Sequence, residues 1–264
     1  MQFAELNGII LHYSDTGSHA APALVFSNSL GTDFRVWDAL VPHFASRFRI
    51  IRYDKRGHGL SGAPAAPYTM EDHVGDLAAL LDHLGVSKAS IVGLSVGGMI
   101  AQGLLASRPD LVARMVLMDT AHRIGTRDAW NERIASVQAN GIASISGAIL
   151  ERWFSPTFRQ TSAEAVSLWQ NMLERTPVAG YAGTCAALRD ADYTKEAGHI
   201  GRPVLLMVGS NDGSTPPELV RSTHELIAGS KFVVIDGPGH LPCVESPAET
   251  AAHINRFLQE NSLV

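Results

Sequence analysis

The segment ASIVGLSVGGMIA, residues 89–101, places a glycine-rich turn directly between two apolar runs. Its centre has the spacing Gly-x-Ser-x-Gly around Ser95. Glycines two residues before and after a serine remove the side chains that would collide on a sharp strand-to-helix turn. A helix that starts at once points its free N–H groups at that serine. The segment therefore predicts a strand, a nucleophilic Ser95 and a helix, with the amide of Val96 facing the reaction.

The rest of the chain alternates between short apolar runs and helical patterns. The predicted strands are 3–6, 9–13, 23–27, 49–53, 90–93, 112–118, 203–208 and 231–235. The predicted helices are 36–45, 70–84, 97–107, 217–227 and 247–259. Such alternation indicates an α/β fold with a mostly parallel eight-stranded sheet and helices on both faces. Asn7-Gly8 favours a tight hairpin turn, so the first two strands should form an antiparallel edge.

One long stretch breaks this alternation. Residues 122–198 contain helical patterns and no convincing strand, and they hold three of the four tryptophans, Trp130, Trp153 and Trp169. We interpret this stretch as a helical cap inserted between strands 6 and 7, with residues 1–121 and 199–264 forming the core domain. The simpler alternative is a set of extra packing helices.

A serine hydroxyl needs a neighbouring base to react at neutral pH. Of eleven histidines, His240 stands out because it follows the last predicted strand, in KFVVIDGPGHLPCVESP. Asp212 follows the preceding strand, in RPVLLMVGSNDGSTPP, and is the preferred acid to orient the histidine. Asp119, at another strand end, is a rival acid, and Asp236 is a third. The chain order Ser95, Asp212, His240 is the order of α/β-hydrolase triads.

Composition excludes several classes of function. The formal net charge is −5 and the basic residues are scattered, so no nucleic-acid surface is expected. No apolar run approaches the ~20 residues of a membrane span, and the first fifteen residues lack a secretion signal. The two cysteines, Cys185 and Cys243, fit reduced thiols in a cytoplasmic protein. No metal-ligand spacing or dinucleotide fingerprint appears, so no cofactor is expected.

The motifs GLSVGG, YDKRGHGLSG, VGSNDGSTPP and GPGHLPCVESP, in this order of strands, resemble the α/β-hydrolase superfamily along nearly the whole chain. In that family the third strand is usually followed by His-Gly and then by a residue whose backbone N–H binds the oxyanion. Aligned on Trp37, Asn28 and Ser29 stand in place of His-Gly. The resemblance implies that the oxyanion donors are the amides of Leu30 and Val96. An altered, inactive loop is the alternative.

Four further segments narrow the resemblance. FSNSLGTDFRVWD, RYDKRGHG, ERWFSPTF and TPVAGYAGTCAALRDAD resemble the 3-oxoadipate enol-lactonases of the bacterial β-ketoadipate pathway. Two of them lie in the predicted cap, where superfamily members differ most. The resemblance implies hydrolysis of a five-membered enol-lactone with a carboxymethyl arm, which gives 3-oxoadipate in aromatic-compound catabolism.

Such a substrate is a small anion, and a negative protein needs a local cation to bind it. Arg133 lies three residues after Trp130, so the two share one face of a predicted helix. Its guanidinium could hold the carboxylate through two hydrogen bonds while Trp130 and Trp153 wall the apolar side. Arg152 and Arg189 are rival ligands for the same carboxylate.

Three other functions stay open at the level of sequence. A carbon–carbon bond hydrolase of aromatic ring-cleavage products shares the triad and the cap. A general esterase or haloperoxidase-like enzyme would accept simple aryl esters. A binding protein without turnover could keep the fold, and it would not be labelled at Ser95 by a fluorophosphonate.

Overall fold

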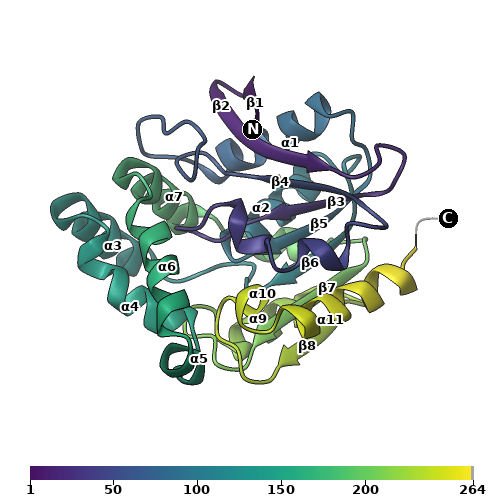
Figure 1. Ribbon diagram of the computed structural model, residues 1–264. Coiled ribbons are helices and arrows are strands. Elements are labelled where there is room, and N and C mark those ends of the chain that lie inside the picture. The colour runs from purple at the N-terminus through teal and green to yellow at the C-terminus, as the bar shows by residue number, and fades with distance from the viewer. Residues whose placement is uncertain (263–264) are drawn as a thin grey trace.

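A computed structural model describes residues 1–262 and contains one eight-stranded sheet (Figure 1). Its strands are β1 (Gln2–Leu6), β2 (Ile9–Thr16), β3 (Ala23–Ser27), β4 (Arg49–Tyr53), β5 (Ala89–Leu94), β6 (Val112–Met118), β7 (Val204–Gly209) and β8 (Lys231–Ile235). The order across the sheet is β1-β2-β4-β3-β5-β6-β7-β8. The β1–β2 and β2–β4 pairs are antiparallel and the other pairs are parallel. The predicted parallel sheet with an antiparallel edge is confirmed.

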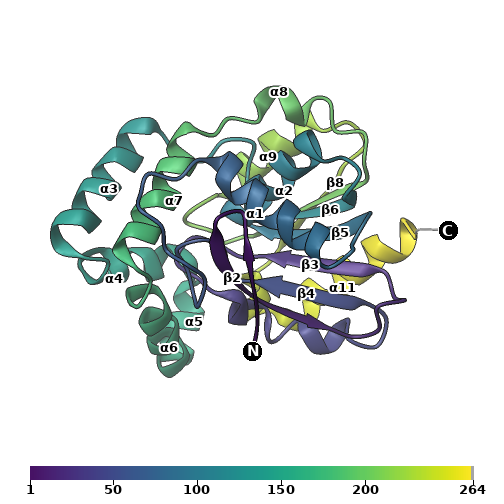
Figure 2. The ribbon, with the colours of Figure 1, turned by 90° about the horizontal axis from the view of Figure 1, so that it is seen from above.

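Helices cover both faces of this sheet. Those outside the insertion are α1 (Met70–His83), α2 (Val96–Ser107), α9 (Pro217–Leu226), α10 (Pro242–Glu245) and α11 (Pro247–Glu260). Figure 2 shows α1, α2 and α9 on one face and α11 on the other. Every residue of β5, β6 and β7 is buried between these layers, which explains their uninterrupted apolar sequences. Within residues 1–262, no helix combines the length and the apolar character of a membrane-spanning segment.

The helix predicted over 36–45 is wrong. Two short 3₁₀ helices, η1 (Phe34–Trp37) and η2 (Val41–His43), occupy this stretch. Pro42 lacks a backbone N–H and disfavours helical backbone at the residue before it, so an α-helix cannot run through this position. The apolar side chains still pack into the core, and Trp37 and Phe44 are fully buried. Their burial produces the apolar spacing that resembled a helix.

The insertion between β6 and β7 is helical, as predicted. It contains α3 (Arg127–Asn140), α4 (Ala143–Trp153), α5 (Pro156–Thr161), α6 (Ala163–Glu174), α7 (Val178–Asp190) and α8 (Thr194–Ala197). Helices α3 to α7 gather at the side of the sheet toward which the parallel strands run (Figure 2). The exact division between residues 122–198 and the core remains a prediction.

Helix α7 touches the core backbone to backbone. A Cβ atom built on Gly180 would lie 2.0 Å from the carbonyl oxygen of Gly57, in the turn that follows β4. A Cβ atom on Gly57 would lie 2.3 Å from Gly180 Cα. Nearby, the amide of Tyr68 donates to the carbonyl oxygen of Gly183 at 3.4 Å. Two facing glycines therefore fix α7 against the core.

Candidate active site

Ser95 lies between β5 and α2 with a backbone that L-residues rarely adopt, φ +56° and ψ −120°. Two contacts with the end of β6 hold this strained conformation. The Ser95 amide donates to the carbonyl oxygen of Met118 at 2.9 Å, and the Thr120 hydroxyl donates to the Ser95 carbonyl oxygen at 2.6 Å. The Ser95 hydroxyl makes no capping bond to α2. It is therefore available to react.

The two glycines around Ser95 are required by close backbone contacts. A Cβ atom on Gly97 would lie 2.0 Å from the carbonyl oxygen of Ser27, and one on Gly93 would lie 2.4 Å from the carbonyl oxygen of Gly97. Both distances are far below van der Waals contact. The spacing Gly-x-Ser-x-Gly thus lets α2 start against the ends of β3 and β5.

His240 and Asp212 form a buried hydrogen-bonded pair at the ends of β8 and β7. His240 Nδ1 lies 3.0 Å and 2.9 Å from the two carboxylate oxygens of Asp212. Burial raises the pKa of the Asp212 carboxyl, but the His240 ring and hydrogen bonds from Thr215 outweigh it, so the pKa is lowered. An ionised Asp212 keeps the proton of the imidazole on Nδ1. The lone pair of Nε2 is then free to act as a base.

The sequence did not reveal the groups that select Asp212. Its Oδ1 accepts from the amides of Ser214 at 2.7 Å and Thr215 at 3.0 Å, and its Oδ2 accepts from the Thr215 hydroxyl at 2.6 Å. Three donors within three residues of the carboxylate stabilise its ionised form. The string Asp-Gly-Ser-Thr was the available signal, because short polar residues after an aspartate favour such a turn.

The rival acids are placed differently. Asp236 lies on the surface and accepts from the Ser210 hydroxyl at 3.3 Å. Asp119 is fully buried, its Oδ1 accepts from the Gly209 amide at 3.0 Å, and its Oδ2 has no partner among residues 1–262. Burial and the nearby charge of Asp212 hold the pKa of the Asp119 carboxyl well above its usual value. These effects favour the protonated form of Asp119 and the ionised form of Asp212.

One ligand atom from each of Asp119, Asp212 and His240 falls within 4.8 Å of the other two, which is close enough for a shared metal ion. Two of these three groups already have hydrogen-bond partners in the site. His240 Nδ1 pairs with Asp212, and the Asp212 carboxylate also accepts from Ser214 and Thr215. The arrangement fits a proton-transfer site.

The loop after β3 lies opposite His240. The Ser29 hydroxyl is 3.5 Å from His240 Nε2, and Leu30 lines the same cavity as Ser95. Leu30 is 7 % exposed, and within residues 1–262 its amide has no hydrogen-bond acceptor. Val96 begins α2, so its amide has no acceptor inside the helix either. In the described part of the chain, both predicted oxyanion donors are therefore N–H groups without an acceptor.

A cavity of about 130 Å³ lies between these residues and the cap. Ser95, His240 and Leu30 line it from the core, and the three predicted cap residues Trp130, Arg133 and Trp153 line it from above. Arg152 and Tyr181, the latter not predicted, also line it from the cap side, together with Ile124, Gly125, Ala129, Ile149 and Leu188. The helices of the insertion therefore bring Trp130, Arg133 and Trp153, and the rival Arg152, to the cavity of Ser95 and His240.

The cavity contains two arginines without acidic partners. Among residues 1–262, neither Arg133 nor Arg152 forms an ion pair, and the Arg133 guanidinium lies 5.0 Å from the centre of the Trp130 ring. The third candidate, Arg189, points elsewhere. It donates to Asn131 at 3.0 Å and pairs with Asp190 at 2.6 Å. The cavity is thus equipped to bind an anion.

These observations define the class of protein. The α/β hydrolase fold family model matches residues 22–247, and the chain belongs to this family. It is 35% identical over 90% of its length to 3-oxoadipate enol-lactonase 2 of Acinetobacter baylyi, of which 89% is covered. It is also 35% identical over 96% of its length to 3-oxoadipate enol-lactonase 1 of the same organism, with 94% covered.

Among solved structures, the chain is similar to the enol-lactonase from Burkholderia xenovorans LB400. The TM-score is 0.95 at 35% identity, and the match covers 98% of this chain and 100% of that one. At this coverage, the sheet and the helical insertion both have counterparts in the crystal structure.

The close contact at Gly97 leads to a paired prediction. Gly97→Ala should lower the free energy of unfolding by at least about 1–3 kcal/mol, because the new methyl group overlaps the β3 backbone. Gly147→Ala is the matched control, since Gly147 lies in α4 with nothing within 4 Å of its Cβ position. There alanine should raise the free energy of unfolding by about 0.5–1 kcal/mol. Urea unfolding followed by circular dichroism measures both; equal stabilities would contradict the contact.

The two aspartates give a second pair. Asp212→Asn should lower kcat by roughly 10³–10⁴-fold, because the amide cannot hold the imidazole in the required tautomer. Asp119→Asn should change kcat less than about fivefold, since an amide resembles the protonated carboxyl in shape and charge. Turnover of an aryl ester measures both variants. A larger loss in Asp119→Asn would reverse the assignment of the acid.

Proposed function

We propose that the protein hydrolyses 3-oxoadipate enol-lactone to 3-oxoadipate, as a step of aromatic-compound catabolism. One observation carries the proposal: a cavity lined by Ser95 and His240 on one side and, on the other, by Arg133 and Arg152, which form no ion pair within residues 1–262. Such a cavity suits a small ester with a carboxylate arm. The 35% identity to two 3-oxoadipate enol-lactonases supports this choice of lactone.

Ring opening begins at the lactone carbonyl. Ser95 Oγ attacks this carbon while His240 Nε2 takes the hydroxyl proton, and Asp212 stabilises the imidazolium that forms. The carbonyl oxygen becomes an oxyanion, which the amides of Leu30 and Val96 bind. Each such donor contributes about 2.7–4 kcal/mol to transition-state stabilisation.

The ring C–O bond then breaks with an enolate as leaving group. The imidazolium of His240 returns the proton to give an enol, which converts to the ketone. The opened chain stays attached to Ser95 as an ester. Water, deprotonated by His240, attacks this ester and releases 3-oxoadipate with Ser95 restored. Every proton taken is returned, and this sequence of steps uses no cofactor.

Arg133 binds the carboxylate arm in this scheme. Its guanidinium can donate two parallel hydrogen bonds to a carboxylate. Trp130 and Trp153 supply apolar walls and are 8 % and 4 % exposed. The local cation is needed because the net charge of the protein, −5, repels a dianionic product and its anionic precursor at long range.

Ser95→Ala tests the function directly. Purified wild-type protein should open 3-oxoadipate enol-lactone. The reaction is monitored by the loss of the ultraviolet absorbance of the lactone. Ser95→Ala should lower kcat by at least about 10³-fold, because it removes the nucleophile. Asp119→Asn serves as a variant that keeps the nucleophile.

Other outcomes discriminate the alternatives. Turnover of a vinylogous diketone in place of the lactone would indicate a carbon–carbon bond hydrolase. Rapid turnover of aryl esters with a slow lactone reaction would indicate a general esterase. A folded protein that neither turns over these substrates nor reacts with a fluorophosphonate at Ser95 would be a binding protein.

The carboxylate contact gives a separate prediction. Arg133→Met should raise KM for the enol-lactone by about 10–100-fold, which corresponds to loss of a charged hydrogen bond of about 1.5–3 kcal/mol. Turnover of an uncharged aryl ester should change little in the same variant. Arg189→Met is the matched control, because that arginine lies outside the cavity. An unchanged KM in Arg133→Met would leave Arg152 as the carboxylate ligand.

A further inference from the structure

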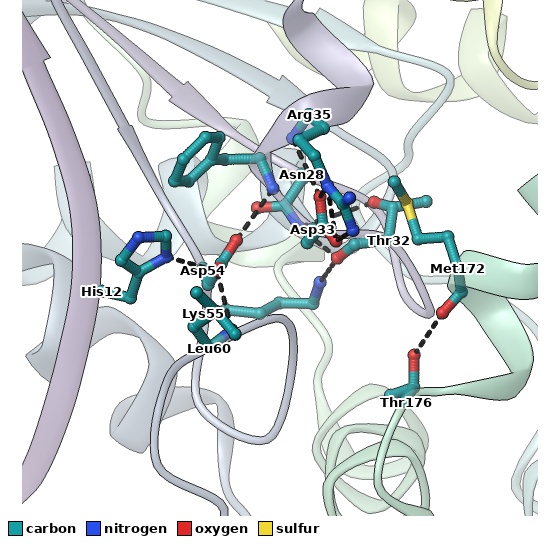
Figure 3. Close-up of polar contacts among 11 residues, drawn as sticks. His12, Asn28, Thr32, Asp33, Arg35, Asp54, Lys55, Leu60, Met172 and Thr176 are labelled. Carbon is teal, nitrogen blue, oxygen red and sulfur yellow. Dashed lines mark hydrogen bonds and ion pairs between the residues drawn. The ribbon is translucent and has the colours of Figure 1, made fainter. Parts of the chain in front are cut away.

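The oxyanion loop, residues 28–32, rests on the turn that follows β4. Lys55, in this turn, is 1 % exposed and extends beneath the loop (Figure 3). Its Nζ donates to the carbonyl oxygens of Ser29 at 2.5 Å and Thr32 at 3.2 Å. Within residues 1–262 it has no carboxylate partner within 4.0 Å. A buried ammonium thus takes two backbone carbonyls of the loop as its partners.

The carbonyl of Ser29 collects several donors. Besides Lys55, it accepts from the Thr32 hydroxyl at 2.9 Å and the Thr32 amide at 3.2 Å. The next peptide is fixed from the same turn, since the Gly31 amide donates to His58 Nε2 at 3.0 Å. His58 Nδ1 in turn lies 3.1 Å from the carbonyl oxygen of Arg56, which sets the tautomer. The turn therefore holds the loop at consecutive peptide groups.

The orientation of the Ser29–Leu30 peptide follows from these contacts. The carbonyl and the N–H of a trans peptide point in opposite directions. Because the carbonyl of Ser29 points toward Lys55, the amide of Leu30 points away from it. That amide has no acceptor within residues 1–262, and Leu30 lines the cavity of Ser95. Lys55 and the reaction centre thus lie at opposite ends of one peptide group.

A cation at the carbonyl end also changes the donor strength of that peptide. Hydrogen bonds polarise one another along a chain, and a low local dielectric strengthens the effect. An ammonium that withdraws electron density from the Ser29 carbonyl makes the Leu30 N–H a stronger donor. The oxyanion that forms in catalysis is the group that gains most from this.

We propose that Lys55 is a positioning residue for hydrolysis, which orients and polarises the Ser29–Leu30 peptide so that the Leu30 amide stabilises the oxyanion. This inference rests on the proposed hydrolytic function, with Leu30 as an oxyanion donor. A buried lysine is otherwise unfavourable, because the ammonium group loses its hydration on burial. Burial lowers the pKa of Lys55 to about 7, while Asp54 and Asp33 act in the opposite direction, so the ammonium form on which the proposal rests predominates below about pH 7.

The test compares Lys55→Met, which keeps the length of the side chain and removes the charge, with Lys195→Met on the surface. Lys55→Met should lower kcat for the enol-lactone by about tenfold or more while KM changes less than about threefold. The rate of phosphonylation of Ser95 by a fluorophosphonate should fall by a similar factor, since that adduct also places an oxygen at the Leu30 amide. A purely structural lysine would not produce this split between kcat and KM.

The outcomes are distinct. A folded Lys55→Met protein with wild-type kcat and phosphonylation rate would overturn the role of Lys55. Wild-type protein that neither hydrolyses esters nor reacts at Ser95 would overturn the hydrolytic function itself.

If Lys55→Met does not fold, wild-type protein decides the matter. The chain has four lysines, so ¹⁵N labelling of their side chains gives a simple spectrum. Phosphonylation of Ser95 should shift the Lys55 signal and leave those of Lys88, Lys195 and Lys231 in place. An unmoved Lys55 signal would contradict the proposal.

Discussion

Hydrogen bonding between parallel strands is the constraint on which the site depends. The pairs β3–β5, β5–β6, β6–β7 and β7–β8 run in one direction, so the residue that follows each strand arrives at the same edge of the sheet. Ser29, Ser95, Asp119, Asp212 and His240 all follow strands in this way. Ser29 and His240 are 211 positions apart in sequence, yet Ser29 Oγ lies 3.5 Å from His240 Nε2. The pairing of the strands brings these two residues together, and the local sequence around either of them does not predict their proximity.

The buried charges at this edge keep different protonation states because their neighbours differ. Asp212 is ionised since it gathers donors from its own turn and from His240. Asp119 lies within 4.8 Å of Asp212 and has one amide donor, and burial beside that charge raises the pKa of its carboxyl. Lys55 is buried against carbonyl oxygens instead of carboxylates. Burial, the nearest charges and the local hydrogen-bond donors thus set the protonation preference of each group, while the net charge of −5 acts only at long range.

Much of the fold could be predicted because buried parallel strands have continuous apolar sequences. Ser95 could be predicted because the strained turn around it requires glycines at fixed positions. The sequence does not decide which aspartate orients His240, because Asp119 and Asp212 both follow a strand. The hydrogen-bond partners that distinguish the two carboxylates come together only in the folded structure. The helix predicted over 36–45 is wrong because the apolar residues of this stretch are buried by two 3₁₀ helices and their connection, without an α-helix. Spacing on a helix likewise could not exclude Arg189, since it does not tell how the helix is rotated against the core.

The contact between the facing glycines of α7 and the core limits how the cap can move. Gly57 and Gly180 meet without side chains between them, so α7 cannot slide or tilt there without breaking a backbone contact. Helix α7 is therefore fixed to the core at this contact, and the cap cannot lift away from the sheet as a single body while the contact holds. Rearrangement of the cap at this contact therefore requires the turn at Gly57 to move together with α7.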